Sequence, residues 1–119
     1  SPATEGSFHM PTFRIYLDHS KADQSLVLID KAWPVMRAAA MEAFDVPAGV
    51  CKLSVIRVEN DPDTCPISVE ISFLEKSGRT PEKTGLICDA PFEAIRSLTG
   101  ISPFVGASMR APETFVFRK

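Results

Sequence analysis

Position 11 is a proline that directly follows a methionine, in the stretch His9-Met10-Pro11. His-Met is also what a common cloning site encodes, and residues 1–9 are mostly small or polar and show no periodicity. We therefore interpret residues 1–10 as an expression leader plus the initiator methionine. Removal of the methionine from a chain that starts Met-Pro would leave Pro11 with a free secondary amine.

Such an amine has useful acid–base chemistry. An unperturbed α-amino group titrates at about pH 8, and an apolar or cationic environment lowers that pKa toward neutrality. Pro11 could then act as a general base. The structural alternative is that Pro11 only opens an edge strand, where its missing N–H group costs nothing. Position alone favours this structural interpretation.

Composition predicts one globular domain over residues 11–119 of the 119-residue chain. Hydrophobic residues make up 45% and charged residues 24%, so a modest core is expected. The net charge of −2 comes from mixed signs, which argues against nucleic acid as a partner. No apolar run approaches the roughly 20 residues that span a bilayer, and no signal peptide is recognised. We therefore expect no membrane partner.

The residues that bind metals are few and poorly spaced. Cys51, Cys65 and Cys88 are an odd number without metal-like spacing, and they indicate reduced thiols in a cytoplasmic protein. His9 lies in the presumed leader, and His19 alone does not make a metal site. The sequence thus predicts neither a metal nor a cofactor. Cys51 and Cys88 lie in apolar segments and are expected to fill the core.

The first half of the chain reads as strand, helix, strand. Residues 13–18 alternate apolar and polar side chains, as in a half-buried strand. Ser20 with Asp23 resembles a capping box. A helical stripe with spacings of three and four follows, with Pro34 inside it: Leu26, Ile29, Trp33, Met36, Ala40 and Phe44. Residues 50–58 are rich in β-branched side chains and predict a second strand. Trp33, like Tyr16 on the first strand, is expected in the core.

The second half follows the same order. A proline again opens a strand, over residues 66–74. Thr80 is a good helix N-cap, with Pro81 at the first helical position. The apolar stripe of this helix is formed by Ile87, Ala90, Ala94 or Ile95, and Leu98, with Pro91 inside the helix. A fourth strand over 104–109 and a short β-prone tail at 115–117 complete the chain.

The two halves therefore form internal repeats, 11–63 and 66–119. Three pairs match at offsets of 55, 58 and 57: Pro11 with Pro66, Lys21 with Arg79, and Pro34 with Pro91. Right-handed β-α-β crossovers pair the two strands of each repeat in parallel. The sequence thus predicts an α+β fold, in which a four-stranded mixed sheet carries two helices on one face. If the bare face is apolar, we expect an oligomer to bury it.

These features resemble the tautomerase superfamily, which contains 4-oxalocrotonate tautomerase, 5-carboxymethyl-2-hydroxymuconate isomerase, malonate semialdehyde decarboxylase and macrophage migration inhibitory factor (MIF). The resemblance covers Pro11 to about Phe117. It is carried by Pro11 after methionine, by Glu42-Ala43-Phe44-Asp45-Val46-Pro47, and by Ser77-Gly78-Arg79-Thr80-Pro81-Glu82-Lys83. The last stretch resembles the family's Gly-Arg-(Ser/Thr)-x-Glu-x-Lys turn, although Lys83 follows Glu82 without the usual spacer.

The resemblance assigns roles to four residues. It implies that Pro11 is the catalytic acid or base. The family's strand–helix arginine, which binds a substrate carboxylate, corresponds to Lys21 in the first repeat and Arg79 in the second. Its second cation corresponds to Lys52, whose counterpart in the second repeat is Gly106, a departure from the pattern. The alternative for each of these cations is a solvated surface charge.

The implied function is that of a tautomerase or isomerase acting on a small enol or keto carboxylic acid, without a cofactor, as a homotrimer. Decarboxylation, hydration and dehalogenation are alternatives within the superfamily. A further alternative is a non-catalytic, MIF-like binding protein. A keto–enol isomerisation moves a proton between carbon and oxygen. The Pro11 amine suits this reaction, because an amine with a pKa near neutrality can both remove the proton and return it.

Overall fold

The computed structural model describes residues 11–75, 79–111 and 118. The presumed leader and the tail at 115–117 lie outside these residues. The elements follow one another in two β-α-β units: β1 (Thr12–Asp18), α2 (His19–Phe44), β2 (Lys52–Val58), β3 (Ile67–Leu74), α3 (Pro81–Thr99) and β4 (Phe104–Arg110). A short 3-10 helix, η1 (Ala48–Val50), leads into β2.

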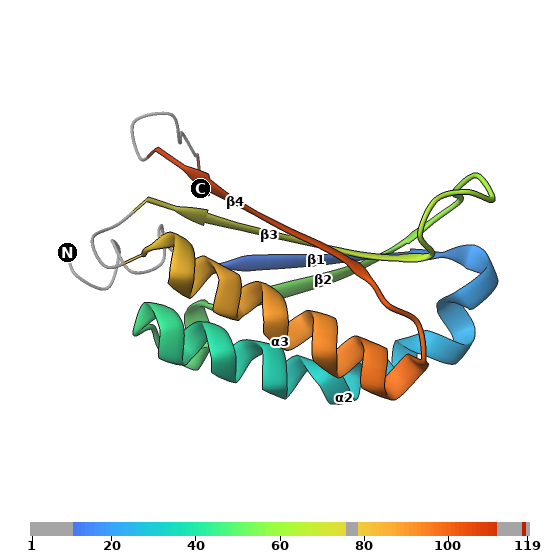
Figure 1. Ribbon diagram of the computed structural model, residues 1–119, viewed down its shortest axis with the longest axis horizontal. Helices are drawn as coiled ribbons and strands as arrows, with labels where there is room; N and C mark the ends of the chain where they lie inside the picture. Colours follow the sequence, from blue (N-terminus) through green and yellow to red (C-terminus); the bar gives the residue numbers. More distant parts are fainter. Residues whose placement is uncertain (1–10, 76–78, 112–117, 119) are drawn as a thin grey trace.

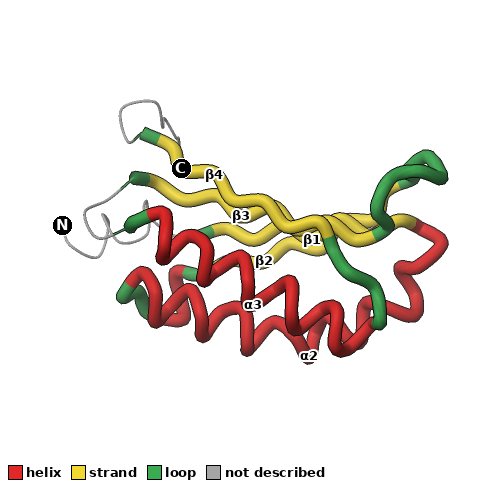
Figure 2. The backbone as a smooth tube through the Cα atoms, in the orientation of Figure 1, coloured by secondary structure: helices red, strands yellow, loops and turns green. Residues whose placement is uncertain are grey.

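The four strands form one mixed sheet in the order β2-β1-β3-β4. Each β-α-β unit pairs its two strands in parallel, and the units join through antiparallel pairing of β1 with β3. Both helices lie side by side against the same face of the sheet (Figures 1 and 2). This arrangement confirms the predicted fold class.

The core lies between the sheet and the helix layer. Every second residue of the two central strands is buried there: Phe13, Ile15, Leu17, Ile67, Val69, Ile71 and Phe73. Trp33 packs edge-on against Phe13, with ring centroids 5.4 Å apart. Cys51 belongs to the same cluster and Cys88 packs against it, which confirms that both thiols fill the core.

The buried stripe of α2 depends on smaller residues than the sequence suggested. Its buried positions include Ala22, Ser25 and Ala32, whereas Leu26 is 46% exposed. Leu98 of α3 is also largely exposed, at 38%. We expected both leucines in the core. Small side chains can occupy the buried side of a helix that packs closely on its neighbours. The positions of the large apolar side chains therefore did not identify the buried face of α2.

The exact alignment of the repeats differs from the prediction. An offset of 55 would place Ser68 on Phe13, but Phe13 faces the helices and Ser68 lies on the opposite face of the sheet. Because side chains alternate along a strand, an odd offset exchanges the two faces. The match of Pro11 with Pro66 is therefore wrong for single residues, although both repeats have the same element order. The match of Lys21 with Arg79 fails for another reason, because Lys21 lies in the first turn of α2 whereas Arg79 precedes the N-cap of α3.

The sheet face without helices is largely polar. Strand alternation and register place on it the polar residues Thr12, Arg14, Tyr16, Ser54, Ser68, Glu70, Ser72 and Ser108, together with the apolar Ile56 and Phe104. Arg14 donates from Nη1 to the Ser72 hydroxyl oxygen across the strands, at 3.4 Å. This face is therefore not a continuous apolar surface, and its largest exposed apolar side chain is Phe104, which is 67% exposed.

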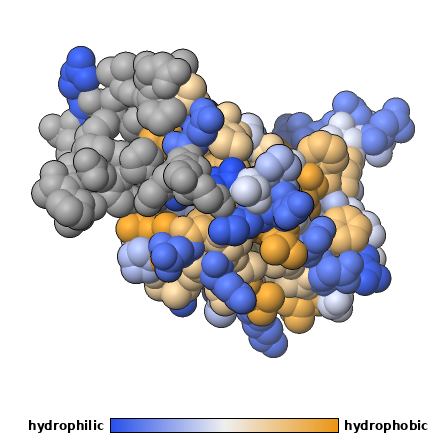
Figure 3. Space-filling model, turned by 60° about the vertical axis from the view of Figure 1, so that its left-hand side comes forward, coloured by the Kyte–Doolittle hydropathy of each residue, from blue (hydrophilic) through white to orange (hydrophobic). Residues whose placement is uncertain are grey.

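The exposed surface of the helix layer mixes residue types. Figure 3 turns the left end of Figure 1 forward and shows hydrophobic residues interspersed among hydrophilic ones. No helix in the described ranges is long and apolar enough to cross a bilayer.

Candidate functional site

Pro11, Lys52 and Arg79 lie at one end of the sheet. Antiparallel pairing places the start of β1 beside the end of β3, with Thr12 opposite Ser72. Parallel pairing places Lys52, the first residue of β2, beside Thr12. Arg79 follows β3 after a short connection. This end of the sheet is the left end of Figure 1, where α2 also ends and α3 begins.

Pro11 immediately precedes a central strand. It is almost fully buried, and its carbonyl oxygen accepts a hydrogen bond from the Lys52 backbone N–H at 3.1 Å. The structural alternative placed Pro11 on an edge strand, but β1 lies between β2 and β3. A proline is compatible with a central strand only near its beginning or at a bulge. Pro11 meets this condition, because it directly precedes Thr12, the first residue of β1.

Arg79 is buried rather than solvated. Only 6% of its surface is exposed, and its Nη1 group donates to the Leu74 carbonyl oxygen at 2.7 Å. The guanidinium carbon lies 4.7 Å from the ring centroid of Phe44 and 5.8 Å from that of Phe73. Its Nε and Nη2 atoms are buried and have no hydrogen-bond partner among the described residues. The interpretation of Arg79 as a solvated surface charge is therefore wrong.

Burial dominates the electrostatics around Arg79. Desolvation lowers the pKa of the guanidinium, although arginine stays protonated in proteins. Burial raises the pKa of the neighbouring Cys51 thiol, against the opposing influence of Arg37, Arg79 and Lys52. Cys51 is therefore a neutral thiol at neutral pH and provides no counter-charge. A buried cation with two unused donors is a site at which an anionic ligand would be stabilised.

The two lysines have different positions. Lys52 is exposed and lies beside the start of β1. Lys21 is half-buried in the first turn of α2, beyond the opposite end of β1. The seven residues of β1 extend over about 20 Å. One chain therefore brings Pro11, Lys52 and Arg79 to the same end and leaves Lys21 at the other.

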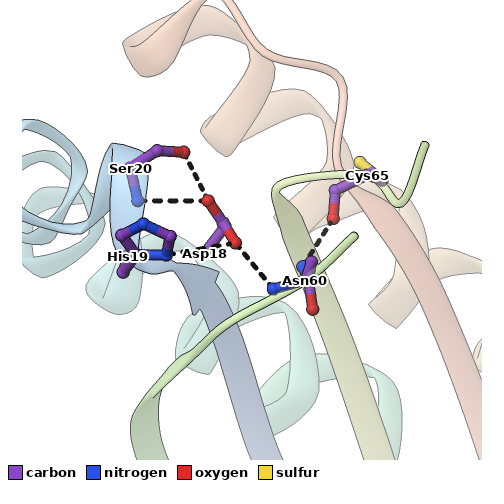
Figure 4. Close-up of polar contacts among 5 residues, drawn as sticks. All are labelled: Asp18, His19, Ser20, Asn60 and Cys65. Carbon is purple, nitrogen blue, oxygen red and sulfur yellow. Dashed lines mark hydrogen bonds and ion pairs between the residues drawn. The ribbon is translucent and has the colours of Figure 1, made fainter. Parts of the chain in front are cut away.

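The end of β1 near Lys21 is organised by Asp18 (Figure 4). Asp18 is 8% exposed and caps α2, whereas we expected Ser20 to be the cap. Its Oδ2 atom accepts hydrogen bonds from the Ser20 backbone N–H, at 3.1 Å, and from the Ser20 hydroxyl. Its Oδ1 atom accepts from the Asn60 backbone N–H at 2.8 Å. A direct strand-to-helix junction leaves no loop for the predicted capping box.

The hydrogen bonds to Asp18 lower its pKa to about 2, with the Ser20 hydroxyl contributing most. Asn60 in turn donates from Nδ2 to the Cys65 carbonyl oxygen at 3.4 Å, so the cluster ties the β2–β3 connection to the start of α2. His19 Nδ1 lies 3.7 Å from Asp18 Oδ1. The Ser20 hydroxyl donates to Asp18 and not to His19. Asp18, His19 and Ser20 therefore form a helix cap and not a catalytic triad, in which the serine would donate to the histidine.

A hollow lies on the bare face of the sheet. It has a volume of about 360 Å³ and crosses β1, β3 and β4, with Tyr16, Glu70, Phe104 and Gly106 in its lining. The prediction that Tyr16 is a core residue is wrong, because its even-numbered position faces away from the helices.

Within the described ranges, no three His, Cys, Asp or Glu side chains gather where they could bind a metal ion.

Comparison with known proteins identifies the fold. The FG41 malonate semialdehyde decarboxylase, solved with 3-bromopropiolate as inhibitor, is 20% identical, with 91% of this chain and 89% of that chain covered and a TM-score of 0.61. A native fused 4-OT is 13% identical, with 89% and 91% covered and a TM-score of 0.63. The macrophage migration inhibitory factor of Toxoplasma gondii is 13% identical, with 89% and 95% covered and a TM-score of 0.59.

These similarities show that the chain has the fold of the tautomerase superfamily. No family model matches the sequence, and no curated protein does. At such low identity the likeness extends to the fold alone.

The Asp18 cap predicts a pH-dependent effect of Asp18→Asn. Both carboxylate oxygens accept hydrogen bonds, whereas an amide offers one acceptor, so the variant should unfold at a lower urea concentration at pH 6.5. The native pKa is lowered from 3.8 to about 2, so the carboxylate stabilises the fold above about pH 4. That stabilisation disappears as pH falls through 2. The urea midpoints of the two proteins should therefore converge on acidification.

Asp23→Asn is the matched control, because Asp23 is exposed and forms an ion pair with Arg57. Exposed pairs contribute about 0–1 kcal/mol, so this variant should change the midpoint little at any pH. A difference between wild type and Asp18→Asn that stays constant or widens toward pH 3 would show that the carboxylate charge is not what the cap uses.

Proposed function

We propose that this protein is a tautomerase or isomerase in which the amine of Pro11, freed by removal of residues 1–10, is the general acid and base. Its substrate is a small enol or keto carboxylic acid. The observation that carries the proposal is the buried guanidinium of Arg79, with two unused donors, at the same end of the sheet as Pro11. A carboxylate is the anion that suits those donors.

The proposed reaction moves one proton. The unprotonated Pro11 amine removes a proton from the enol oxygen or from the carbon next to the carbonyl, and the resulting ammonium group returns it at the other position. Arg79 holds the substrate carboxylate during this transfer. Lys52 stabilises negative charge that develops on the enolate oxygen. Positive charges on Lys52 and Arg79, together with burial, lower the pKa of the amine and keep it basic at neutral pH.

A decarboxylation is the second candidate, because one structural neighbour is a malonate semialdehyde decarboxylase. The same cations would stabilise the enolate left when a carboxylate is lost as carbon dioxide. Product analysis separates the two reactions, since isomerisation conserves the mass of the substrate and decarboxylation does not. A non-catalytic binding protein would bind a carboxylate without changing it.

A homotrimer would give Lys21 a role in the site. Within one chain Lys21 is separated from Pro11 by the length of β1. A neighbouring copy, related by a closed rotation, can bring its own Lys21 to the Pro11 end. Phe104, on the edge strand β4, is 67% exposed and offers apolar surface for such a contact. We therefore propose a site shared between subunits.

The proposed base predicts that the leader blocks activity. Residues 1–10 convert the Pro11 nitrogen into an amide, which is not basic, so the full chain should be folded and nearly inactive. Cleavage after Met10 should restore turnover of an enol acid such as phenylenolpyruvate, followed by its absorbance. Pro11→Ala in the cleaved protein should lower kcat by about 10²–10⁴-fold, the usual contribution of general base catalysis.

Pro66→Ala in the cleaved protein is the matched control, because this mid-chain proline has no free amine. It should keep the wild-type kcat. Equal rates for the full chain and the cleaved protein would exclude Pro11 as the catalyst.

The shared site predicts complementation between two inactive variants. Pro11→Ala and Lys21→Ala, both cleaved after Met10, should each be impaired alone, and the two proteins, unfolded and refolded together at equal amounts, should recover activity. If each site takes Pro11 from one chain and Lys21 from the next, about a quarter of the sites in a random trimer are intact. The mixture should sediment at about three times the mass of one cleaved chain. A mixture no more active than the average of its components would contradict the shared site.

A further inference from the structure

The guanidinium of Arg79 is held by one hydrogen bond and by two aromatic rings. Nη1 donates to the Leu74 carbonyl oxygen at 2.7 Å. The ring of Phe44 lies under the guanidinium, with its centroid 4.7 Å from the guanidinium carbon, and the ring of Phe73 lies at 5.8 Å. The two rings also pack on each other, with centroids 4.7 Å apart and planes tilted by 57°. These contacts restrict both the position and the rotation of the group.

One edge of the guanidinium remains unused. The N–H bonds of Nε and Nη2 lie parallel along one side of the planar group, and neither nitrogen has a partner among the described residues. Two parallel donors match the two oxygens of a carboxylate in a planar, bidentate contact. An ammonium group in the same place could offer only a point charge.

We propose that Phe44, supported by Phe73, is a positioning residue that holds Arg79 so that its Nε–Nη2 edge binds one planar carboxylate side-on. This inference rests on the proposed function in that the carboxylate is taken to be that of the substrate. Phe44 acts through Arg79 and touches no reacting atom. Phe44 is the last residue of α2, and Phe73 lies near the end of β3. The helix layer and the sheet therefore both contact this cation.

The aromatic ring contributes more than bulk. Phe44→Leu keeps an apolar side chain at the position but removes the π face that attracts the cation. A cation–π contact that is shielded from water changes an equilibrium by about 5- to 30-fold. Without it the guanidinium would be less fixed, so Phe44→Leu should weaken carboxylate binding by a factor in that range. Binding of a neutral ligand should not change.

The experiment follows the Arg79 Nε–H signal by ¹⁵N-edited NMR in the protein cleaved after Met10, with Arg79→Lys to assign it. Crotonate is the probe and crotonamide its neutral counterpart of the same shape. We expect crotonate to shift the Nε–H signal, crotonamide to leave it in place, and Arg79→Lys to bind crotonate at least tenfold more weakly. In ligand-free Phe44→Leu, the Arg79 Nε–H signal should lose the ring-current shift that the Phe44 ring causes. The affinity of this variant for crotonate should fall by about 5- to 30-fold.

Ile67→Val controls for core damage, because Ile67 is fully buried at the opposite end of β3. It should leave the signal and the affinity unchanged. With a carboxylate substrate, Phe44→Leu should raise KM more than it lowers kcat. Unchanged crotonate affinity in Phe44→Leu, or equal binding by Arg79→Lys, would overturn the inference. Crotonate binding does not depend on turnover, so an inactive wild type that still binds crotonate through Nε would refute the proposed function alone.

Discussion

The antiparallel pairing of β1 with β3 is the constraint on which the arrangement of this protein depends. It joins the two β-α-β units into one sheet and places Thr12 opposite Ser72. The same register places the start of β1 and the end of β3 at one end of the sheet, and with them Pro11 and Arg79. The length of β1 separates Lys21 from that end. A change of register by one residue would exchange the buried and exposed faces of the central strands.

Burying the charge of Arg79 at this end of the sheet is unfavourable, and the rest of the fold must offset that free energy. A buried charge without a counter-ion is unfavourable by several kcal/mol, and Arg79 lacks an anionic partner among the described residues. A hydrogen bond from Arg79 to Leu74 and two aromatic contacts compensate part of this cost. At the other end of β1, both carboxylate oxygens of Asp18 accept hydrogen bonds from the chain. The contrast distinguishes a cation available to a ligand from a carboxylate used for structure.

Much of the fold followed from local patterns in the sequence. Alternation marked the strands, spacings of three and four marked the helices, and Thr80 with Pro81 marked the start of α3, where Thr80 accepts from the Lys83 backbone N–H at 3.3 Å. Details that depend on three-dimensional proximity did not follow. Asp18 caps α2 through Oδ2, while its Oδ1 atom accepts from Asn60, forty-two residues away, and this second contact is not visible in the local pattern that favoured Ser20 as the cap.

The candidate site was predictable in part for the same reason. Pro11 and Arg79 were identified from residue type and motif, but the burial of Arg79 and its contact with Phe44 require the packing of α2 against β3. Lys21 was matched to Arg79 by counting residues, which ignores that one lies inside a helix and the other before an N-cap. Sequence offsets report spacing along the chain, whereas a site depends on which end of a strand each residue occupies.

The proposed function depends most directly on the protonation of the Pro11 amine. Its pKa can be measured by NMR in protein carrying ¹⁵N-labelled proline and cleaved after Met10, by following the Pro11 nitrogen shift against pH. Burial and the nearby cations should lower this pKa below the value of about 8 that is usual for α-amino groups, and Arg79→Gln should raise it again. A Pro11 amine that titrates at or above its usual value, with no response to Arg79→Gln, would contradict the proposed general base.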